Sequence, residues 1–530
     1  MSMAVTLPIP STPSSLFASI DMGTNSFKLL IVHADPSGRF FPVHSKKEPV
    51  VLGRDTATTP YSISSESMLR ALQALLKFKS ILNTHNINLC QTRCVATAAV
   101  REALNREEFV DSILEKIGFQ VYVLSGEEEA RLAYLGVLHF LPIYHKLALT
   151  VDIGGGSTEF VIGKEGKVVF GTSLKLGHVT LTQKFPNVDT IPQMREHIRS
   201  VILESGLVEK SKHHGFERAV GSSGTIRAIE EALFRGFVLD MVDGAVLSGN
   251  SKRDWSFTRG DLSSVVEGFC GGGKKEKDRR DGFFKRRSEF IVAGALLLDE
   301  IFDLLGVDEM QVSGYSLSEG VIADTLSKVH PCYDLNAIAR WHSVMRLALR
   351  FNSKNKMRAG AQCAVIAKDI FEALRKSKEF DRIEDKLSPL LNEKDLEYLE
   401  AASLLHSIGL VNGKKDYHKQ SYHIIMNGDH LSGYNAEEVK LIALLARHHR
   451  KKFPESDALT EISNQEKQRF RYLCAIIRIS VALQQHESLN PRESSEVKDP
   501  CLPTIIQRIT ENKVPELRQE TENFKAVFEL

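Results

Sequence analysis

The chain has 530 residues, which exceeds a single small domain and predicts three or four domains of about 150 residues each. Lysine and arginine number 68 and aspartate and glutamate 67, so the formal net charge of +1 excludes a global field that would draw the protein to nucleic acid or to an anionic membrane. With 42% hydrophobic and 25% charged residues, the composition excludes a disordered or fibrous chain.

The first residues, 1–16, are rich in serine and proline and carry no charged side chain, so we predict a flexible N-terminal extension. The segment lacks the basic start of a secretory signal, and no apolar run approaches the roughly 20 residues that span a membrane. The seven cysteines are scattered, which favours a reducing compartment over a disulfide framework. We therefore expect a cytoplasmic protein whose partners include neither a membrane nor a nucleic acid polymer.

A hairpin is the first ordered element that the sequence predicts, with FASI and FKLLIV as strands and DMGTNS as the turn. The same pattern returns at LALTVDI, GGGSTE and FVIG, where Asp152 aligns with Asp21 and Ser157 with Ser26. Strands and helices alternate after each hairpin, and a third glycine turn follows at GSSGT. This repeat of one supersecondary unit predicts two related α/β lobes.

The amino-acid composition of the chain changes twice after the third turn. Residues 251–287 are glycine-rich and then basic, which predicts an exposed flexible loop. An apolar helix over 290–306 follows, and the strand, turn and helix of VSGYSLSEGVIADTLS close the second lobe. Beyond about residue 330, long amphipathic stretches predict an all-helical region, and the polar residues from about 487 onward predict a short C-terminal piece.

The two hairpin turns carry groups that suit a phosphate chain. Their glycines let backbone amides approach phosphate oxygens, and their serines add donors. Aspartate at a strand end would repel such a chain unless it holds Mg²⁺, so Asp152 and Glu159 are the metal candidates. The alternatives are local: Asp152 bonds its own turn, and Glu159 lies on an exposed strand face.

The segment SGEEEAR begins a helix with acidic residues. Ser125 and Glu128 have the spacing of a capping box, which explains one glutamate locally. Another carboxylate, placed beside bound phosphates, would orient and deprotonate a water for attack on phosphorus. Arg101, which follows a strand and opens a helix, would grip a phosphate bidentately or else lie exposed, and Lys28 is more simply a surface residue.

In order, the motifs DMGTNS, ATAAVREA, SGEEEAR, VDIGGGSTE, GSSGT and SEGV resemble those of the exopolyphosphatase and guanosine pentaphosphate phosphatase family, from about Phe17 to about His486. The resemblance implies two actin-like (ribonuclease H-like) α/β lobes followed by an all-α HD-like domain. It also implies hydrolysis that releases terminal orthophosphate from inorganic polyphosphate or a guanosine polyphosphate. The expected segments are the extension 1–16, lobe I 17–135, lobe II 136–328, the HD-like domain 329–486 and the C-terminal piece 487–530.

The resemblance also assigns roles to residues. Glu129 becomes the catalytic base, Arg101 a phosphate ligand, and Asp152 and Glu159 the Mg²⁺ environment. The phosphate cradle comprises residues of the three turns: Gly23, Thr24, Asn25, Ser26, Gly154, Gly155, Gly156, Ser157, Gly221, Ser222, Ser223, Gly224 and Thr225.

The sequence departs from the family pattern at several places. Ser318 stands where many relatives carry an arginine, which affects substrate preference. His406 is followed by Ser407 instead of aspartate, so we expect the helical domain's histidines to be surface or packed residues. They are His342, His406, His418, His448 and His449. A further small domain of long relatives is expected to be missing or reduced.

Three readings of the function stay open at this point. A phosphohydrolase is favoured because the SGEEEAR segment supplies a base for an attacking water. A regulator that senses a nucleotide or polyphosphate with the same cradle, without hydrolysis, is the alternative, and SEGV gives it some support. An actin-like ATPase or sugar kinase would leave Glu129 unexplained. The apolar faces of the helical domain are compatible with a homodimer.

Overall fold

The computed structural model describes residues 16–53, 61–234, 256–270, 288–376, 391–428, 430–450, 464–489 and 515–528. The chain divides into two compact units, Met1–Ala339 and Arg340–Leu530. The predicted N-terminal extension lies outside the described residues except for Leu16. The residue bounds of the five predicted segments stay predictions.

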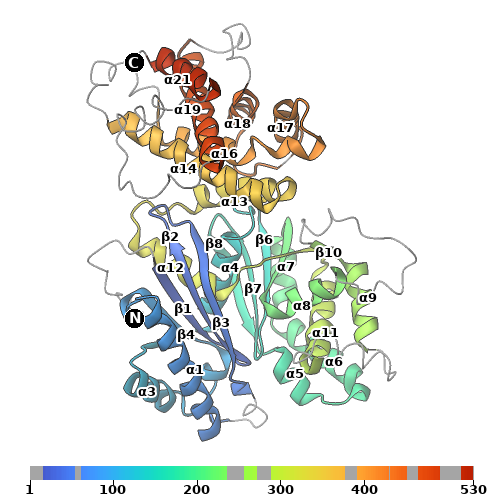
Figure 1. Ribbon diagram of the computed structural model, residues 1–530. Helices are drawn as coiled ribbons and strands as arrows, with labels where there is room; N and C mark the ends of the chain where they lie inside the picture. The colour runs from blue at the N-terminus through green and yellow to red at the C-terminus, as the bar shows by residue number, and fades with distance from the viewer. Residues whose placement is uncertain are drawn as a thin grey trace. The chain divides into compact units, whose positions relative to one another are not determined.

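A mixed sheet of five strands forms the first lobe of the first unit (Figure 1), in the order β3-β2-β1-β4-β5. Its strands are β1 (Leu16–Met22), β2 (Ser26–Ala34), β3 (Phe40–Pro49), β4 (Thr92–Ala96) and β5 (Val121–Val123). The predicted hairpin is confirmed, because β1 and β2 pair antiparallel while β4 joins β1 in parallel. Phe27 and Leu29 of β2 pack into one core and Leu30 and Val32 into another, so FKLLIV is apolar except at Lys28 because both faces of the sheet are covered.

The second lobe repeats this topology in a six-stranded sheet of order β10-β11-β9-β6-β7-β8. Its strands are β6 (Ala148–Ile153), β7 (Thr158–Lys164), β8 (Lys167–Leu174), β9 (Arg218–Ser222), β10 (Ser256–Thr258) and β11 (Glu309–Val312). Here too an antiparallel hairpin, β6 with β7, is joined by a parallel strand, β9. The register is also repeated, because Asp21 lies opposite Lys28 in the first hairpin and Asp152 opposite Glu159 in the second. The predicted repeat of one unit is therefore confirmed.

Helices cover the sheets of both lobes. They are α1 (Ser65–Thr84), α2 (Ala98–Arg101), α3 (Arg106–Ile117), α4 (Gly126–Leu138), α5 (His178–Lys184), α6 (Ile191–Glu204), α7 (Leu207–His214), α8 (Ser223–Phe234), α9 (Arg259–Cys270), α11 (Ser288–Leu305) and α12 (Leu317–Val329). The third predicted turn, GSSGT, is the junction where β9 ends and α8 begins. The described residues contain no helix that is both long and apolar enough to cross a membrane.

Each lobe contributes one helix that packs on the sheet of the other lobe. Helix α4 packs on β7 and β8 of the second sheet, whereas α12, from the end of the second lobe, packs on β1 and β2 of the first. The two helices cross in direct backbone contact: a Cβ at Gly136 would lie 2.0 Å from the carbonyl oxygen of Ser316, and one at Gly320 would lie 1.7 Å from that of Leu132. This crossing joins the two lobes at their centre.

Part of the segment predicted to be a flexible loop is ordered. Residues 256–270 form β10 and α9, contrary to the prediction for 251–287, and the rest of that segment lies outside the described residues. Phe257, Leu262, Val266 and Phe269 are buried in the core of the second lobe. Their apolar spacing was masked by the glycines and basic residues that follow them in the sequence.

The second unit is helical, as predicted. Its helices are α13 (Leu335–Phe351, which begins before the division), α14 (Lys354–Lys376), α16 (Glu393–Leu405), α17 (Tyr417–Met426), α18 (Ala436–His448), α19 (Asn464–Leu489) and α21 (Pro515–Phe528). His406 and His449 are buried with their ring centroids 4.7 Å apart, and His449 Nε2 lies 3.0 Å from the Tyr417 hydroxyl. These two histidines and the buried His418 are therefore packed residues, as expected.

The last helix, α21, belongs to the core of the second unit. The prediction of a polar piece with little periodicity missed it, because most of its residues are polar, and from residue 518 to 528 the large buried apolar groups are Phe524 and Phe528. The Phe528 ring stacks on Tyr472 with centroids 4.9 Å apart. The guanidinium of Arg478, on α19, donates to Glu520 at 2.8 and 2.6 Å.

We expect the substitution Phe528→Ala to lower the free energy of unfolding of the second unit by about 3–5 kcal/mol, because it removes a fully buried ring and leaves a cavity. Urea unfolding followed by far-UV circular dichroism measures this change. The control Val365→Ala removes an exposed side chain of the same unit and should change stability by less than about 0.5 kcal/mol. Equal unfolding midpoints for the two variants would show that α21 is not part of the core.

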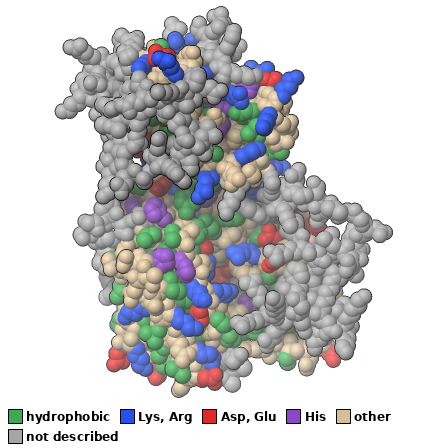
Figure 2. All heavy atoms as spheres, in the orientation of Figure 1, with side chains coloured by type: hydrophobic (Ala, Val, Ile, Leu, Met, Phe, Trp, Pro, Cys, Tyr) green, Lys and Arg blue, Asp and Glu red, His purple; other side chains and the backbone are tan. Residues whose placement is uncertain are grey.

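The surface carries charges of both signs. In Figure 2, the Lys and Arg side chains on the described part of the lower face are interspersed with Asp and Glu side chains and with hydrophobic ones. This mixture matches the balanced composition of the chain. A polyanion would have to be met by a local site instead of a broad basic face.

Candidate active site

A cavity of about 330 Å³ lies where the two hairpin turns, the β9–α8 junction and the start of α12 come together. Most of the residues that were predicted from the sequence line it. They are Gly23, Thr24, Asn25, Ser26, Glu129, Asp152, Gly154, Gly155, Gly156, Ser157, Glu159, Ser223, Gly224 and Thr225. Segments that are far apart in the sequence thus meet at one site.

Three predicted residues lie behind the lining. Gly221 is inside β9, where a Cβ would lie 2.7 Å from the sulfur of Met310, so this glycine serves packing. Ser222 donates a hydrogen bond of 2.5 Å to Asp152. Arg101 reaches the site through Glu129, and it ends the short helix α2 instead of opening a helix as predicted.

Glycines allow the two hairpin turns to approach each other. A Cβ at Gly155 would lie 3.0 Å from the Thr24 Cβ, and one at Gly156 would lie 2.9 Å from the Thr24 hydroxyl. At the third segment, Ser223 has a φ of +93°, a strained conformation for a residue with a side chain. Strain of this kind is typical of sites where surrounding structure fixes the backbone for a function.

Glu129 alone among the three consecutive glutamates of α4 lines the cavity. The Ser125 hydroxyl accepts a hydrogen bond from the amide of Glu128, which is one half of the predicted capping box. The other half is missing, because the Glu128 carboxylate pairs with Arg131 at 2.8 Å. Glu129 is 8% exposed and accepts a hydrogen bond of 2.7 Å from Arg101. The side chain of Arg101 is itself only 17% exposed, so it is not the exposed arginine of the alternative interpretation.

The environment of Glu129 suits a proton acceptor. Burial raises the pKa of Glu129 to about 7, with Arg101 opposing the rise and the carboxylates of Asp21 and Asp152 adding to it. A general base works best with a pKa near the working pH. Glu129 is therefore a carboxylate that both accepts and releases a proton near neutrality.

The other carboxylates of the cavity are also shielded from water: Glu159 is buried, and Asp21 and Asp152 are half-buried. Burial raises the pKa of Asp21 to about 6, with Lys28 opposing and Asp152 adding to the rise. Burial also raises the pKa of Asp152, and hydrogen bonds from Ser222 and Ser316 oppose that rise. Burial and the nearby Glu129 raise the pKa of Glu159, which is 3% exposed and so does not lie on an exposed strand face.

Sequence reasoning missed several residues of the lining. They are Asp21, Lys28, Ser45, Lys47, Thr97, His178, Arg227, Ser316 and Glu319. Lys28 was interpreted as a surface residue, but it lines the cavity and pairs with Glu319 at 2.8 Å. The repeat contained the signal for it, because the shared register puts Lys28 where the second hairpin has Glu159.

One pair of carboxylates in the cavity, Asp21 and Asp152, is suited to hold a divalent cation. The described residues contain no group of three or more His, Cys, Asp or Glu side chains arranged to hold a metal, but Mg²⁺ commonly uses one or two protein carboxylates and completes its shell with phosphates and water. Asp21 and Asp152 are half-buried and repel each other, which a cation would relieve. Glu159 fits less well, because Ser157 and Ser173 already donate to its Oε1 at 2.6 and 2.8 Å.

We expect the free energy of unfolding to fall as the pH rises from about 4.5 to 7. The pKa values of Asp21 and Glu129, about 6 and 7 against ordinary values of 3.8 and 4.5, mean that the folded state binds more protons than the unfolded state in this window. Urea unfolding of wild type and Asp21→Asn across the window measures the effect, and the variant should lose less stability than wild type. The exposed Glu66→Gln serves as control, and a fall as steep in Asp21→Asn as in wild type would contradict the assignment.

Comparison with known proteins gives one consistent family. A model of the Ppx/GppA phosphatase family matches residues 30–329, and a model of Ppx/GppA phosphatase domain III matches residues 339–502. An exopolyphosphatase from Cytophaga hutchinsonii has 27% identity and a TM-score of 0.52 over 59% of this chain and 98% of that one. An exopolyphosphatase-like protein has 26% identity and a TM-score of 0.50 over 59% and 99%. A family member from Aquifex aeolicus has 27% identity and a TM-score of 0.49 over 60% and 99%.

The comparisons agree with the observed architecture. The family model that matches residues 30–329 covers the strands and helices of both lobes, so the two mixed sheets with their helices are actin-like lobes. The helical region that follows corresponds to the all-α domain III. The fold class expected from the sequence is thus confirmed for the lobes and for the helical region.

Proposed function

Because the chain belongs to the Ppx/GppA phosphatase family, we propose that it releases terminal orthophosphate from inorganic polyphosphate, using a water activated by Glu129 in the cavity between the two hairpin turns. The observation that carries this proposal is the Glu129–Arg101 pair: a buried carboxylate with a pKa of about 7 that lines the cavity. Polyphosphate is favoured as substrate because similar solved structures are named exopolyphosphatases. A guanosine polyphosphate is the other substrate to test.

The turns hold the end of the phosphate chain. Backbone amides of the glycine turns and the hydroxyl of Ser26 line the cavity from opposite hairpins, so they donate hydrogen bonds to phosphate oxygens on both sides. Lys28 and Arg227 add positive charge to the same lining. Reactions of this kind depend mainly on positioning and charge neutralisation, which this lining supplies.

Glu129 accepts the proton of the attacking water. Arg101 holds the carboxylate by its Oε2 and keeps its pKa from rising further. At neutral pH a large fraction of Glu129 is then ionised and able to take a proton as the water attacks the terminal phosphorus in line with the leaving phosphate oxygen. The proton passes to Glu129, and the anhydride bond breaks to release orthophosphate and a chain shorter by one unit.

Asp21 and Asp152 are the residues that would hold Mg²⁺. When bound, this ion would neutralise charge on the phosphates beside a group of acids. The acidic side chains of the lining would otherwise repel a polyanion, since Asp21, Glu129, Asp152, Glu159 and Glu319 all contribute to it.

The test is orthophosphate release by the purified protein with Mg²⁺, measured side by side on polyphosphates of defined length and on guanosine pentaphosphate. The proposal predicts turnover of polyphosphate, with the release of one orthophosphate at a time. Turnover of the nucleotide alone would move the substrate to a guanosine polyphosphate. Tight binding of all substrates without turnover would support a sensing regulator and overturn the proposal.

A further inference from the structure

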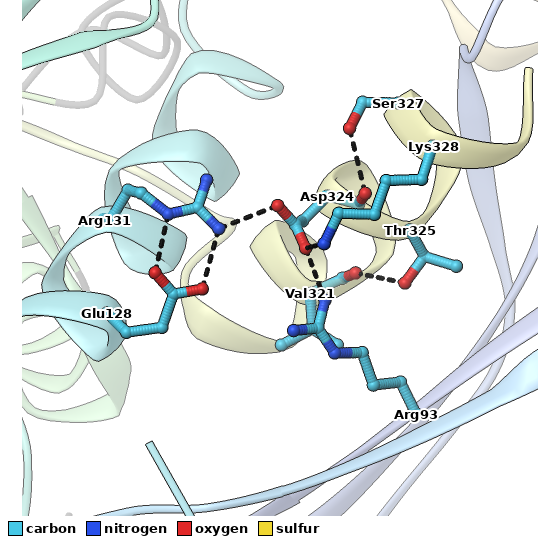
Figure 3. Close-up of polar contacts among 8 residues, drawn as sticks. All are labelled: Arg93, Glu128, Arg131, Val321, Asp324, Thr325, Ser327 and Lys328. Atoms are coloured by element: carbon cyan, nitrogen blue, oxygen red, sulfur yellow. Dashed lines mark hydrogen bonds and ion pairs between the residues drawn. The ribbon is translucent and has the colours of Figure 1, made fainter. Parts of the chain in front are cut away.

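A cluster of ion pairs joins α4, α12 and β4 outside the cavity (Figure 3); we call it the Asp324 cluster. Its members are Arg93, Glu128, Arg131, Asp324 and Lys328. Arg131 of α4 donates to one oxygen of Asp324 at 2.7 Å, and Arg93 of β4 and Lys328 donate to the other. A single carboxylate on α12 thus binds cationic side chains from three elements.

Asp324 is ionised at neutral pH. Burial opposes that charge, but hydrogen bonds from Lys328, Arg131 and Arg93 outweigh burial and hold the pKa of Asp324 well below its usual range. Its side chain is 6% exposed and that of Arg93 is 12% exposed, so water screens the pair weakly. The cluster is therefore a fixed connection instead of a titrating one.

Arg131 and Glu129 lie two residues apart on α4, and residues at this spacing project from opposite sides of a helix. On the cavity side, Glu129 is bound by Arg101 at 2.7 Å. On the other side, Arg131 is bound by Asp324 at 2.7 Å. The rotation of α4 about its axis is thus set by contacts on both sides.

The partner helix α12 is itself tied to the cavity. The Ser316 hydroxyl at its start donates to Asp152, and Glu319 pairs with Lys28 at 2.8 Å. Backbone contact at Gly136 and Gly320 brings α4 and α12 together, and apolar side chains of both helices pack between them. A hydrogen-bonded ion pair adds a directional contact to this packing. The Asp324 cluster supplies that directional contact.

We propose that Asp324 is a positioning residue for the Glu129–Arg101 pair: through Arg131 it fixes the rotation of α4, and so the place of the Glu129 carboxylate in the cavity. This inference rests on the proposed function, in which Glu129 activates the attacking water. Asp324 itself touches no reacting atom. Its effect is on the geometry of the base, so it should act on the chemical step and not on the binding of substrate.

The test is the steady-state kinetics of Asp324→Asn, which keeps the size of the side chain and removes its charge. We expect kcat to fall by about 10-fold to 100-fold while KM stays within about twofold, because a small displacement of a catalytic group slows chemistry. The acid limb of the pH profile should also move to higher pH, because a displaced Glu129 loses part of its contact with Arg101. The variant Arg131→Lys keeps the positive charge, but it cannot make the forked contact with Glu128 and contact Asp324 at the same time. It should show the same pattern more weakly.

A matched control is available in the second lobe. Glu300 of α11 is fully buried and pairs with Arg195 and with Arg199 of α6, so it resembles Asp324 in burial and partners. Glu300→Gln should lower the melting temperature as Asp324→Asn does, and leave kcat, KM and the acid limb at wild-type values. This contrast separates loss of stability from loss of positioning.

The proposal is overturned if folded Asp324→Asn has the kcat and acid-limb midpoint of wild type. Should Asp324→Asn fail to fold, Arg131→Lys decides by the same criteria. A wild type without turnover would overturn the proposed function instead. In that case the pKa of Glu129, measured by NMR of carboxyl-labelled glutamate with Glu129→Gln for assignment, tests positioning alone: a rise in Arg131→Lys supports it, and an unchanged value contradicts it.

Discussion

Replacing Glu129 with glutamine is expected to lower the rate of orthophosphate release by about 10²-fold to 10⁴-fold, the usual contribution of a general base. Glutamine keeps the size of the side chain and its contact with Arg101 but accepts no proton. Substrate binding should survive, because the turns that hold the phosphates are untouched. Single-turnover rates and equilibrium binding of a short polyphosphate, measured on the same preparation, separate the two effects.

The matched control for this substitution is Glu127→Gln. Glu127 lies in the same turn of α4, and it is exposed. It should keep the wild-type rate. A Glu129→Gln variant that turns over as fast as Glu127→Gln would remove Glu129 from the mechanism.

The second large effect is expected from replacing Arg101, which binds the proposed base Glu129. We expect Arg101→Met to lower the rate at neutral pH by about 10²-fold to 10³-fold, the loss typical of one preorganised charged donor. Arg101 lowers the pKa of Glu129, so its loss lets that pKa rise above about 7. The base is then protonated at neutral pH, and the acid limb of the pH profile moves to higher pH.

The pH profile distinguishes a raised pKa of Glu129 from the simple loss of a phosphate ligand. If Arg101 acts through Glu129, part of the lost rate returns at alkaline pH, where Glu129 is ionised again. If Arg101 only binds phosphate, KM rises and the acid limb stays in place. Arg106→Met, which changes an exposed arginine at the start of α3, is the control and should match wild type.

The hairpins were predictable because their signals are local. Each consists of apolar strands around a polar glycine turn, and the repeat of Asp21 at Asp152 was visible without any structure. The long helices of the second unit were predictable for the same reason, since their apolar faces recur at helical spacing. Most residues of the predicted cradle line one cavity because they belong to these local motifs.

The features that were missed depend on contacts distant in the sequence. The ion pair of Lys28 forms because α12, which begins at Leu317, brings Glu319 next to it. The raised pKa of Asp21 arises from burial beside Asp152 of the other lobe, which no local pattern encodes. Helix α21 was missed because its few buried residues are diluted by polar ones.

The exchange of α4 and α12 between the sheets was also beyond sequence reasoning. Periodicity identifies both as helices, but it does not say which sheet each one covers. The crossing depends on Gly136 and Gly320, each of which looks like an ordinary helical glycine until the partner backbone is in place. These features connect the site to the rest of the lobes.

In the proposed reaction, a water activated by Glu129 attacks the terminal phosphorus of a phosphate chain held by the two hairpin turns. Hydrolysis of a short polyphosphate in water enriched in oxygen-18, followed by mass spectrometry of both products, tests it most directly. We expect one labelled oxygen in each released orthophosphate and none in the shortened chain, with the labelled product lost in Glu129→Gln. Label in the shortened chain, or an undiminished labelled product from Glu129→Gln, would contradict it.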